Sequence, residues 1–347
     1  MSKSKVLGII GGGQLGSMLC QAAKKIDIKT IVYCDDQDAP AQHYSDEFIC
    51  SSYDDDVQIK EFANQVDIVT FEFENIPVPT LEKINLIKSV FPNPKINFIV
   101  QDREREKKFI NDLGIKTVNY KKISNHNDLK NIELLVPGVL KTTTLGYDGK
   151  GQYVISDIKD LNQIKFDDQY ILEKKINLKK EISVIITRYQ DGESIIYDPI
   201  ENVHKDQILD TSKIPASIDE THIQMSKEYS KKLANKLNYI GTMCVEYFID
   251  EDNNLLVNEI APRVHNSGHL TINAYNISQF EPHVRAVCNL KKIHPTIKSK
   301  AMMKNIIGDE ILNYRNKKFN KNEFFFDYLK KEVKSKRKMG HLTTLEN

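Results

Sequence analysis

The sequence predicts a mixed α/β and α+β protein, with a parallel α/β domain at the N-terminus followed by strand-rich regions. Three observations support this fold class. Apolar runs typical of buried strands alternate with helical segments over residues 1–95. From residue 134 to 204, short strand-like runs follow one another with turn signals between them. Finally, a polar turn separates two strand-like runs that each carry a glutamate, TMCVEYFI (242–249) and LLVNEIAP (255–262).

The N-terminal region begins with VLGII (6–10), a continuous apolar run that is typical of a buried parallel strand. The elements expected after it are a helix at 14–26, strands at 30–34 and 46–52, a helix at 57–66 and a strand at 67–73. This order predicts a parallel sheet with right-handed crossovers. Two prolines in FPNPKIN mark a boundary. We therefore expect three domains, over residues 1–97, 98–290 and 291–347.

The middle of the chain opens with a helix at about 102–113, for which Gly114 is a suitable C-terminal cap. Strands are expected at 140–144, 152–155, 170–175, 181–189 and 194–203. Asp191-Gly192 is a hairpin signal between the last two strands. Helices at 219–238 and 278–289 flank the glutamate-bearing hairpin, and a basic tail with an apolar element at 324–329 completes the chain.

Composition limits the possible classes of protein. The 347 residues are 40% hydrophobic and 28% charged, with a net charge of +1, so no overall charge favours nucleic acid or membrane partners. Five scattered cysteines without a CxxC pair argue against a disulfide framework and a structural zinc site. No secretory signal is visible, and no apolar run approaches the roughly 18 residues of a membrane helix. A cytoplasmic location is expected.

The glutamate-bearing hairpin is the strongest candidate for a metal site. If its turn centres on Asp252-Asn253, Glu246 faces Glu259 across the two strands. Like charges in that position destabilise a sheet unless they are neutralised, and Mg²⁺ is bound by one or two carboxylates together with phosphate oxygens. The alternative is a surface hairpin with solvated carboxylates.

Two glycine-rich segments are candidate phosphate sites. GGGQLG (11–16), with Asp35 about twenty positions on, matches the dinucleotide fingerprint, so an NAD-dependent oxidoreductase is a rival hypothesis. LKTTTLGYDGKGQ (140–152) lies between two strands and is no Walker A loop, because Lys150 is followed by glycine. It is suited to be a flap over phosphates, with Lys141 within reach of one; a solvated hairpin is the plain alternative.

Two further segments carry paired carboxylates. TFEFENIP (70–77) places Glu72 and Glu74 at the carboxyl end of a strand, where open α/β sheets bind ligands. ILEKKINLKKEIS (171–183) places Glu173 and Glu181 around a lysine-rich linker, whose backbone is able to read an adenine edge. Ordinary surface carboxylates are the plain alternative for both pairs, and on its own the second segment favours that alternative.

Seven motifs occur together and in a fixed order: GGGQLG, FEFENI, QDR (101–103), LGYDGKGQ, ENVH (201–204), NEIAPRVHNSGH (258–269) and KRKMGH (336–341). In this the chain resembles the 5-(carboxyamino)imidazole ribonucleotide synthetases, ATP-grasp enzymes of purine biosynthesis. The resemblance implies an ATP-grasp fold with a parallel N-terminal domain and a small C-terminal β-rich domain. It implies a ligase that uses ATP, Mg²⁺ and bicarbonate to carboxylate the 5-amino group of aminoimidazole ribonucleotide through carboxyphosphate, releasing ADP and phosphate.

The resemblance also implies roles for individual residues. ATP-binding positions would be Arg103, Lys141, Gly146, Tyr147, Asp148, Gly149, Lys150, Gly151, Gln152, Glu173, Lys174, Lys175, Ile176, Glu181, His204, Asn258 and Glu259. Mg²⁺ would be held by Glu246 and Glu259, and bicarbonate and carboxyphosphate by Arg263, His265 and Asn266, with Lys150 as a further catalytic cation. The ribonucleotide would contact Gln14, Leu15, Glu72, Tyr147, Lys330, Arg337 and Lys338.

Two departures from the family pattern stand out. Thr143-Thr144 occupies positions where members often carry arginine, and KSKRKMGH replaces RPGRKMGH, so that Lys334 stands in place of an arginine. The alternatives are a formate-dependent glycinamide ribonucleotide transformylase and a catalytically inactive, partner-binding member of the fold. We expect small-molecule substrates, a homodimer and functional coupling to the downstream mutase, with no nucleic-acid or membrane partner.

Overall fold

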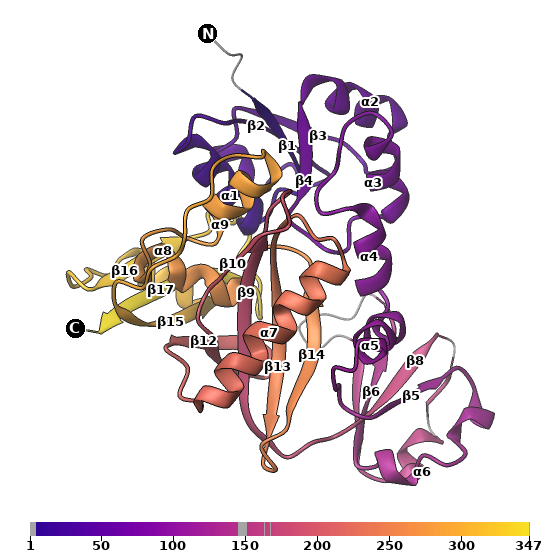
Figure 1. Ribbon diagram of the computed structural model, residues 1–347. Coiled ribbons are helices and arrows are strands. Elements are labelled where there is room, and N and C mark those ends of the chain that lie inside the picture. The colour runs from indigo at the N-terminus through magenta and orange to yellow at the C-terminus, as the bar shows by residue number, and fades with distance from the viewer. Residues whose placement is uncertain (1–4, 145–150, 163, 167, 347) are drawn as a thin grey trace.

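The computed structural model describes residues 5–144, 151–162, 164–166 and 168–346. Its strands form three sheets: a parallel N-terminal sheet, a small antiparallel sheet that we call the lid sheet, and a large central sheet. Figure 1 shows the lid sheet set apart from the central sheet, with α5 between them and the N-terminal sheet at the other end. No helix in these described ranges combines the length and apolar character needed to cross a membrane.

The N-terminal sheet is parallel, as predicted, with strand order β3-β2-β1-β4. The region contains β1 (Val6–Ile10), α1 (Gln14–Lys24), β2 (Lys29–Cys34), the 3₁₀ turn η1 (Pro40–His43), β3 (Glu47–Cys50), α2 (Asp56–Gln65), β4 (Ile68–Phe71), α3 (Val78–Asn85) and α4 (Pro94–Val100). The sequence did not predict the last two helices. Pro94 was read as a linker residue, but it begins α4 behind the capping side chain of Asn93, a position that proline favours.

The lid sheet is antiparallel, with order β5-β8-β6-β7. It follows α5 (Arg103–Asp112) and contains β5 (Tyr120–Ile123), η2 (His126–Leu129), η3 (Glu133–Leu135), β6 (Gly138–Thr142), β7 (Gln152–Ile155), α6 (Ile158–Leu161) and β8 (Tyr170–Lys174). Strand β5, which was not predicted, closes one edge against β8.

The central sheet has the strand order β14-β13-β9-β11-β12-β15-β17-β16, with β10 paired to β9. Its elements are β9 (Leu178–Arg188), β10 (Ser194–Ile196), β11 (Ile200–Lys205), β12 (Ile208–Ile214), α7 (Glu220–Lys236), β13 (Gly241–Asp250), β14 (Leu255–Ala261), η4 (Asn266–Leu270), α8 (Thr271–Ala274), α9 (Phe280–Val287), β15 (Lys300–Ile307), α10 (Glu310–Arg315), β16 (Glu323–Asp327) and β17 (Lys338–Glu346). The strand predicted at 194–203 is two strands, separated by residues that include Pro199, which has no N–H to donate to a ladder.

Strand β13 faces the core on one side and the site on the other. Met243, Val245, Tyr247 and Ile249 are buried in one apolar cluster, and the hydroxyl of Tyr247 forms a 2.7 Å hydrogen bond with Ser230 of α7. Because strand side chains alternate, Glu246 and Phe248 point to the opposite face, where both line a cavity. The core packing under α7 therefore fixes the direction of the Glu246 carboxylate.

The predicted pairing of the two glutamates is confirmed. Glu246 lies directly opposite Glu259 in the β13–β14 ladder. Nearer the turn, however, Phe248 pairs with Leu256, one residue out of the register expected for a turn centred on Asp252-Asn253. A β-bulge next to Glu246 restores the expected pairing. Bulges re-aim side chains, and this one brings the second carboxylate to face the first.

Candidate active site

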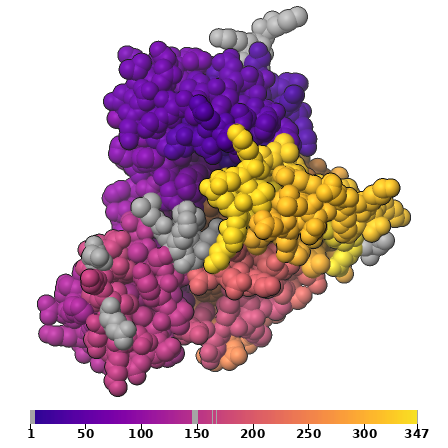
Figure 2. Space-filling model, turned by 180° about the vertical axis from the view of Figure 1, so that it is seen from behind, coloured from indigo at the N-terminus to yellow at the C-terminus, as the bar shows by residue number. Residues whose placement is uncertain are grey.

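A single cleft collects most of the predicted site residues. It has a volume of about 770 Å³ and is lined from all parts of the chain. Figure 2 shows the N-terminal residues (indigo), the lid-sheet residues (magenta) and the C-terminal residues (yellow) as three lobes that converge on the middle of the molecule. The predicted residues that line the cleft are Gln14, Leu15, Glu72, Arg103, Lys141, Gln152, Glu181, His204, Glu246, Asn258, Glu259, Arg263, His265, Asn266, Lys330, Arg337 and Lys338.

The two opposed glutamates are each paired with a basic side chain. Nε2 of His265 lies 2.9 Å from Oε1 of Glu246, and Nη1 of Arg103 lies 3.2 Å from Oε2 of Glu259. Burial alone would raise the pKa of Glu246, but the neighbouring His265 outweighs it and the pKa is lowered. Glu246 is therefore held as a carboxylate, as a metal ligand must be.

The donor set at this pair fits Mg²⁺. Within the described residues, no group of three or more His, Cys, Asp or Glu side chains is arranged to hold a metal ion. Two carboxylates from the protein suit Mg²⁺, which takes most of its remaining oxygens from substrate phosphates and water.

Arg263 is held by Glu74, which the sequence marked as one of two glutamates at the end of a strand but did not connect with this arginine. Nη2 of Arg263 donates to Oε1 of Glu74 at 2.8 Å, and Nε donates to Oε2. Burial would raise the pKa of Glu74, but the guanidinium outweighs it and the pKa is lowered. The bidentate geometry fixes the plane of the guanidinium at the edge of the cleft. The FEFEN motif was the only sequence signal for this pair.

The glycine loop before α1 is occupied by a carboxylate of the protein itself. The N–H groups of Gly13 and Gly16 donate to Glu72 at 2.9 and 3.2 Å. A Cβ on Gly11, where φ is +96°, would lie 2.8 Å from the Glu72 side chain. Glu72 thus takes the helix N-terminus at which a dinucleotide pyrophosphate would bind. This geometry argues against the NAD hypothesis.

The side of the cleft formed by the lid sheet contains a buried ion-pair cluster. Oε2 of Glu173 lies 2.6 Å from Nζ of Lys141, and Oε1 lies 2.9 Å from Nζ of Lys107. Among these three residues only Lys141 lines the cleft. Glu181 is ion-paired with His204; burial would lower the pKa of that histidine, but Glu181 raises it. No sequence motif marks Lys107, so its place here was not predicted.

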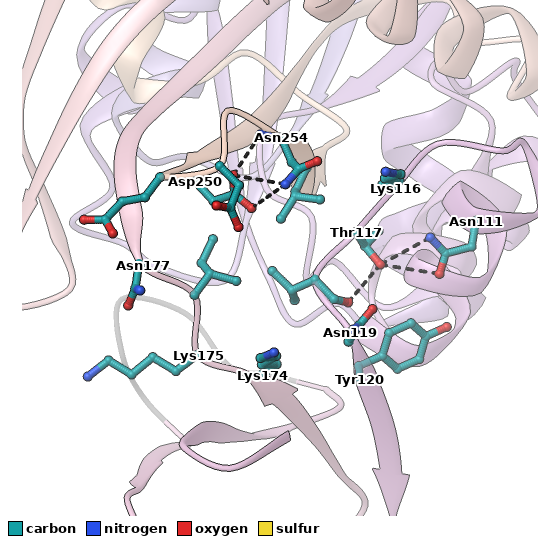
Figure 3. A pocket seen from close by; sticks show the side chains of 15 residues that line it. Asn111, Lys116, Thr117, Asn119, Tyr120, Lys174, Lys175, Asn177, Asp250 and Asn254 are labelled. Atoms are coloured by element: carbon teal, nitrogen blue, oxygen red, sulfur yellow. Dashed lines mark hydrogen bonds between the residues drawn. The ribbon is translucent and has the colours of Figure 1, made fainter. Parts of the chain in front are cut away.

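Lys174, Lys175 and Ile176 line a second cavity of about 860 Å³. Figure 3 shows its labelled side chains arranged around an opening between residues 116–120, 174–177 and the β13–β14 turn, where Asp250 and Asn254 are hydrogen-bonded to each other. Phe248 lines the cleft, and its cross-strand partner Leu256 lines the second cavity. Paired residues share one face of a sheet, so the two cavities follow each other along the hairpin.

The basic tail folds back onto the cleft rather than forming a solvated arm. Nζ of Lys330 donates to the carbonyl oxygen of Lys338 at 2.7 Å. Beside it, the side-chain amide of Asn266 is oriented from both ends. Its Oδ1 accepts from Nδ2 of Asn305 at 2.7 Å, and its Nδ2 donates to the Tyr328 hydroxyl at 3.4 Å.

The predicted flap lies partly outside the described residues. Gly146, Tyr147, Asp148, Gly149 and Lys150 fall there. Gly151 is described with a φ of +69° and lines neither cavity, whereas Gln152 and Thr143 line the cleft. The predicted roles of the flap residues and the three domain boundaries stay predictions.

Comparison with known families identifies the class of protein. Residues 4–101 match the ribonucleotide synthetase preATP-grasp domain, residues 108–280 the ATP-grasp domain, and residues 301–347 the phosphoribosylaminoimidazole carboxylase C-terminal domain. The chain is therefore an ATP-grasp enzyme, as the two-sheet arrangement around the cleft indicates.

Individual relatives narrow the class to one family. N5-carboxyaminoimidazole ribonucleotide synthase from Bacillus subtilis (strain 168) is 39% identical, covering 98% of this chain and 91% of the relative. The enzyme of the same name from Brucella melitensis biotype 1 is 38% identical over 100% of this chain and 98% of its own. The chain belongs to the N5-carboxyaminoimidazole ribonucleotide synthase family. The rival NAD-dependent oxidoreductase hypothesis is wrong.

Solved structures agree with this assignment. An ADP complex of N5-carboxyaminoimidazole ribonucleotide synthetase has a TM-score of 0.94 and 38% identity, covering 100% of this chain and 93% of that one. The synthase from Aspergillus clavatus, in complex with ADP and 5-aminoimidazole ribonucleotide, has a TM-score of 0.92 and 28% identity, covering 100% and 95%. The predicted fold class is confirmed.

Proposed function

We propose that this chain carboxylates the 5-amino group of 5-aminoimidazole ribonucleotide, using ATP and bicarbonate and releasing ADP and phosphate. The observation that carries the proposal is the shared cleft. It joins the opposed carboxylates of Glu246 and Glu259 to the Glu74-bound Arg263 and to the folded-back basic tail. A nucleotide, a small anion and a phosphorylated substrate each have a complementary part of this one cavity.

We assign the nucleotide to the hairpin face that both cavities share. Its phosphates would lie by Arg103 and Lys141, its ribose by Glu181, and its base would extend along Phe248 and Leu256 toward residues 174–176. Glu246 and Glu259 would hold Mg²⁺, which supplies charge neutralisation to the phosphate oxygens when bound. The succession of the two cavities along one face of the hairpin supports this placement.

The anion-binding end of the cleft would take bicarbonate. Arg263, His265 and Asn266 present a guanidinium, an imidazole and an oriented amide side by side. A bicarbonate oxygen attacks the γ-phosphorus of ATP, the bond from that phosphorus to the bridging oxygen breaks, and carboxyphosphate and ADP form. The pre-oriented guanidinium of Arg263 offsets the charge that develops at the transferred group.

The second stage uses the ribonucleotide. Carboxyphosphate breaks down to carbon dioxide and phosphate, and the 5-amino group captures the carbon dioxide and loses a proton. Lys330, Arg337 and Lys338 would bind the 5′-phosphate, with Gln14, Leu15 and Glu72 near the base. Water must be excluded because carboxyphosphate would otherwise be hydrolysed, and the flap over residues 146–152 would serve as the cover.

The proposal extends to the assembly and the cellular location of the enzyme. We propose a homodimer, the commonest closed assembly, acting in the cytoplasm, with a mutase as the next enzyme to use the product. Light scattering on the eluted peak of a sizing column tests the dimer: a monomer mass at micromolar concentration would contradict it.

The function is tested by phosphate release from ATP and Mg²⁺, with bicarbonate and aminoimidazole ribonucleotide supplied or omitted in turn. We expect release to require bicarbonate and to rise strongly with the ribonucleotide. Release that needs formate instead, or that ignores the ribonucleotide, would contradict the proposal.

A further inference from the structure

Lys107 is a buried lysine close to the nucleotide half of the cleft. Its side chain is 2% exposed, and it lines neither cavity. A buried ammonium group is destabilising unless a partner compensates for it. That partner is Glu173, whose Oε1 lies 2.9 Å from Nζ of Lys107; the carbonyl oxygen of Asn258 accepts a longer hydrogen bond of 3.5 Å.

Glu173 is shared between two lysines. Its other carboxylate oxygen lies 2.6 Å from Nζ of Lys141, the lysine that reaches into the cleft. Lys141 pairs with Ile171 across β6 and β8, so Glu173 is its diagonal neighbour on the same face of the sheet. Burial would raise the pKa of Glu173, but the two ammonium groups lower it to about 2. The cluster therefore carries two positive charges and one negative charge.

Helix α5 fixes Lys107 in this position. The N–H of Arg103 donates to the carbonyl oxygen of Thr143 in the lid region at 2.9 Å. The Glu106 carboxylate accepts the N–H of Ile260 on β14 at 2.6 Å. Residues three and four positions apart share one face of a helix, so this face of α5 contacts β14 and the lid region together. Lys107 bridges the two from a rigid element.

We infer that Lys107 is a positioning residue for ATP, because it supplies the net positive charge with which the Lys141–Glu173 pair attracts nucleotide phosphates. The inference rests on the assignment of Lys141 to a phosphate in the proposed function. Without Lys107, both oxygens of Glu173 turn to Lys141 alone. The pair is then neutral, and its ammonium group is held away from the ligand. Because the effective dielectric constant at a protein site is well below that of bulk water, one lost charge weakens phosphate binding substantially.

The test is the affinity for ADP with Mg²⁺, measured by isothermal titration calorimetry. Lys107→Met should weaken binding about tenfold, or about 1.4 kcal/mol. Lys107→Arg, which keeps the charge, should stay within about threefold of the wild type. In the double variant Lys107→Met/Glu173→Gln, Lys141 is the one remaining charge of the cluster, whose net charge is again +1, so affinity should return toward the wild-type value. Lys108→Met is the matched control, because Lys108 is the next residue of α5 and its ion pair with Asp112 is exposed.

Four outcomes would overturn the inference: unchanged affinity in Lys107→Met, no recovery in the double variant, no rescue by arginine, or an equal loss in Lys108→Met. If circular dichroism shows that Lys107→Met does not fold, the double variant decides, since it removes the buried charges of Lys107 and Glu173 together and leaves the Lys141 ammonium group at the wall of the cleft; binding about tenfold weaker than wild type would then overturn the inference. ADP binding requires neither bicarbonate nor ribonucleotide. A failure of ribonucleotide-dependent turnover would therefore contradict the proposed function, but the comparison of ADP affinities among the variants would still test the role of Lys107.

Discussion

Breaking the Glu74–Arg263 pair tests whether the cleft depends on a contact between the N-terminal region and the central sheet. The side chains are only 24% and 16% exposed, and two hydrogen bonds join them. Removing one partner of a buried pair costs about 3–5 kcal/mol, because the other charge is left without compensation. Water from the cleft reaches both groups in part, so we expect Glu74→Gln to lose about 2–3 kcal/mol of unfolding free energy.

Urea unfolding followed by circular dichroism measures this loss, and steady-state kinetics measures its effect on the site. Glu74→Gln should also raise KM for bicarbonate more than KM for ATP, because the guanidinium loses its fixed plane. Asp112→Asn is the matched control, since it breaks the exposed ion pair with Lys108 and should change neither stability nor KM measurably. Equal stability of the two variants, or an unchanged KM for bicarbonate in Glu74→Gln, would refute the reasoning.

Three further predictions follow from single contacts. Glu259→Gln should abolish ATP turnover while the circular dichroism spectrum stays that of the wild type, because it removes one of the two proposed metal carboxylates; near-normal phosphate release would disprove that assignment. Gly13→Ala should lower the unfolding midpoint in urea, because the added Cβ would lie 2.9 Å from the Glu72 carboxylate; a midpoint equal to that of the wild type would show that the loop adjusts. The free energy of unfolding should fall as pH drops from 6.5 toward 4, because burial lowers the pKa of three histidines. The pKa is lowered to about 4 in His283 and to about 3 in His341, and the pKa of His269 is lowered as well. The unfolded chain takes up protons in that window and the folded chain does not, so each histidine contributes a loss of about 1.4 kcal/mol per pH unit. The raised pKa values of the buried carboxyl groups of Glu106 and Glu72 offset part of the effect, because these groups take up protons in the folded chain before they do so in the unfolded chain. The raised pKa of His204 acts mainly above pH 6.5. A flat urea midpoint between pH 6.5 and 5 would contradict the prediction.

Local patterns in the sequence predicted the elements that carry the chemistry. Strand parity placed Glu246 opposite Glu259, and the apolar runs predicted the parallel sheet. This pairing depends on a β-bulge next to Glu246, which no pattern in the sequence predicted. Helices α3 and α4 and the strands β5, β12, β15 and β17 were among the elements missed, because tertiary packing and pairing rather than local propensity determine them.

The contacts that support the site could not be predicted from the sequence for a different reason, namely the distance along the chain between the partners. Glu74 and Arg263 are 189 positions apart, and Lys107 and Glu173 come from separate elements. In sequence, Lys107 is one lysine in a highly charged helix and looks like a solvated residue. Only the packing of α5 against the lid sheet and β14 distinguishes it from its neighbour Lys108. The family motifs marked the residues that we propose contact substrates, and the structure adds the side chains that hold them in place.

The fate of labelled oxygen tests the central claim most directly, namely that bicarbonate is activated by ATP in this cleft before carbon dioxide reaches the amine. Turnover with ¹⁸O-bicarbonate, ATP, Mg²⁺ and aminoimidazole ribonucleotide is followed by mass spectrometry of the released phosphate. Attack of bicarbonate on the γ-phosphorus predicts one ¹⁸O atom in each phosphate. Unlabelled phosphate formed alongside carboxylated product would contradict the account.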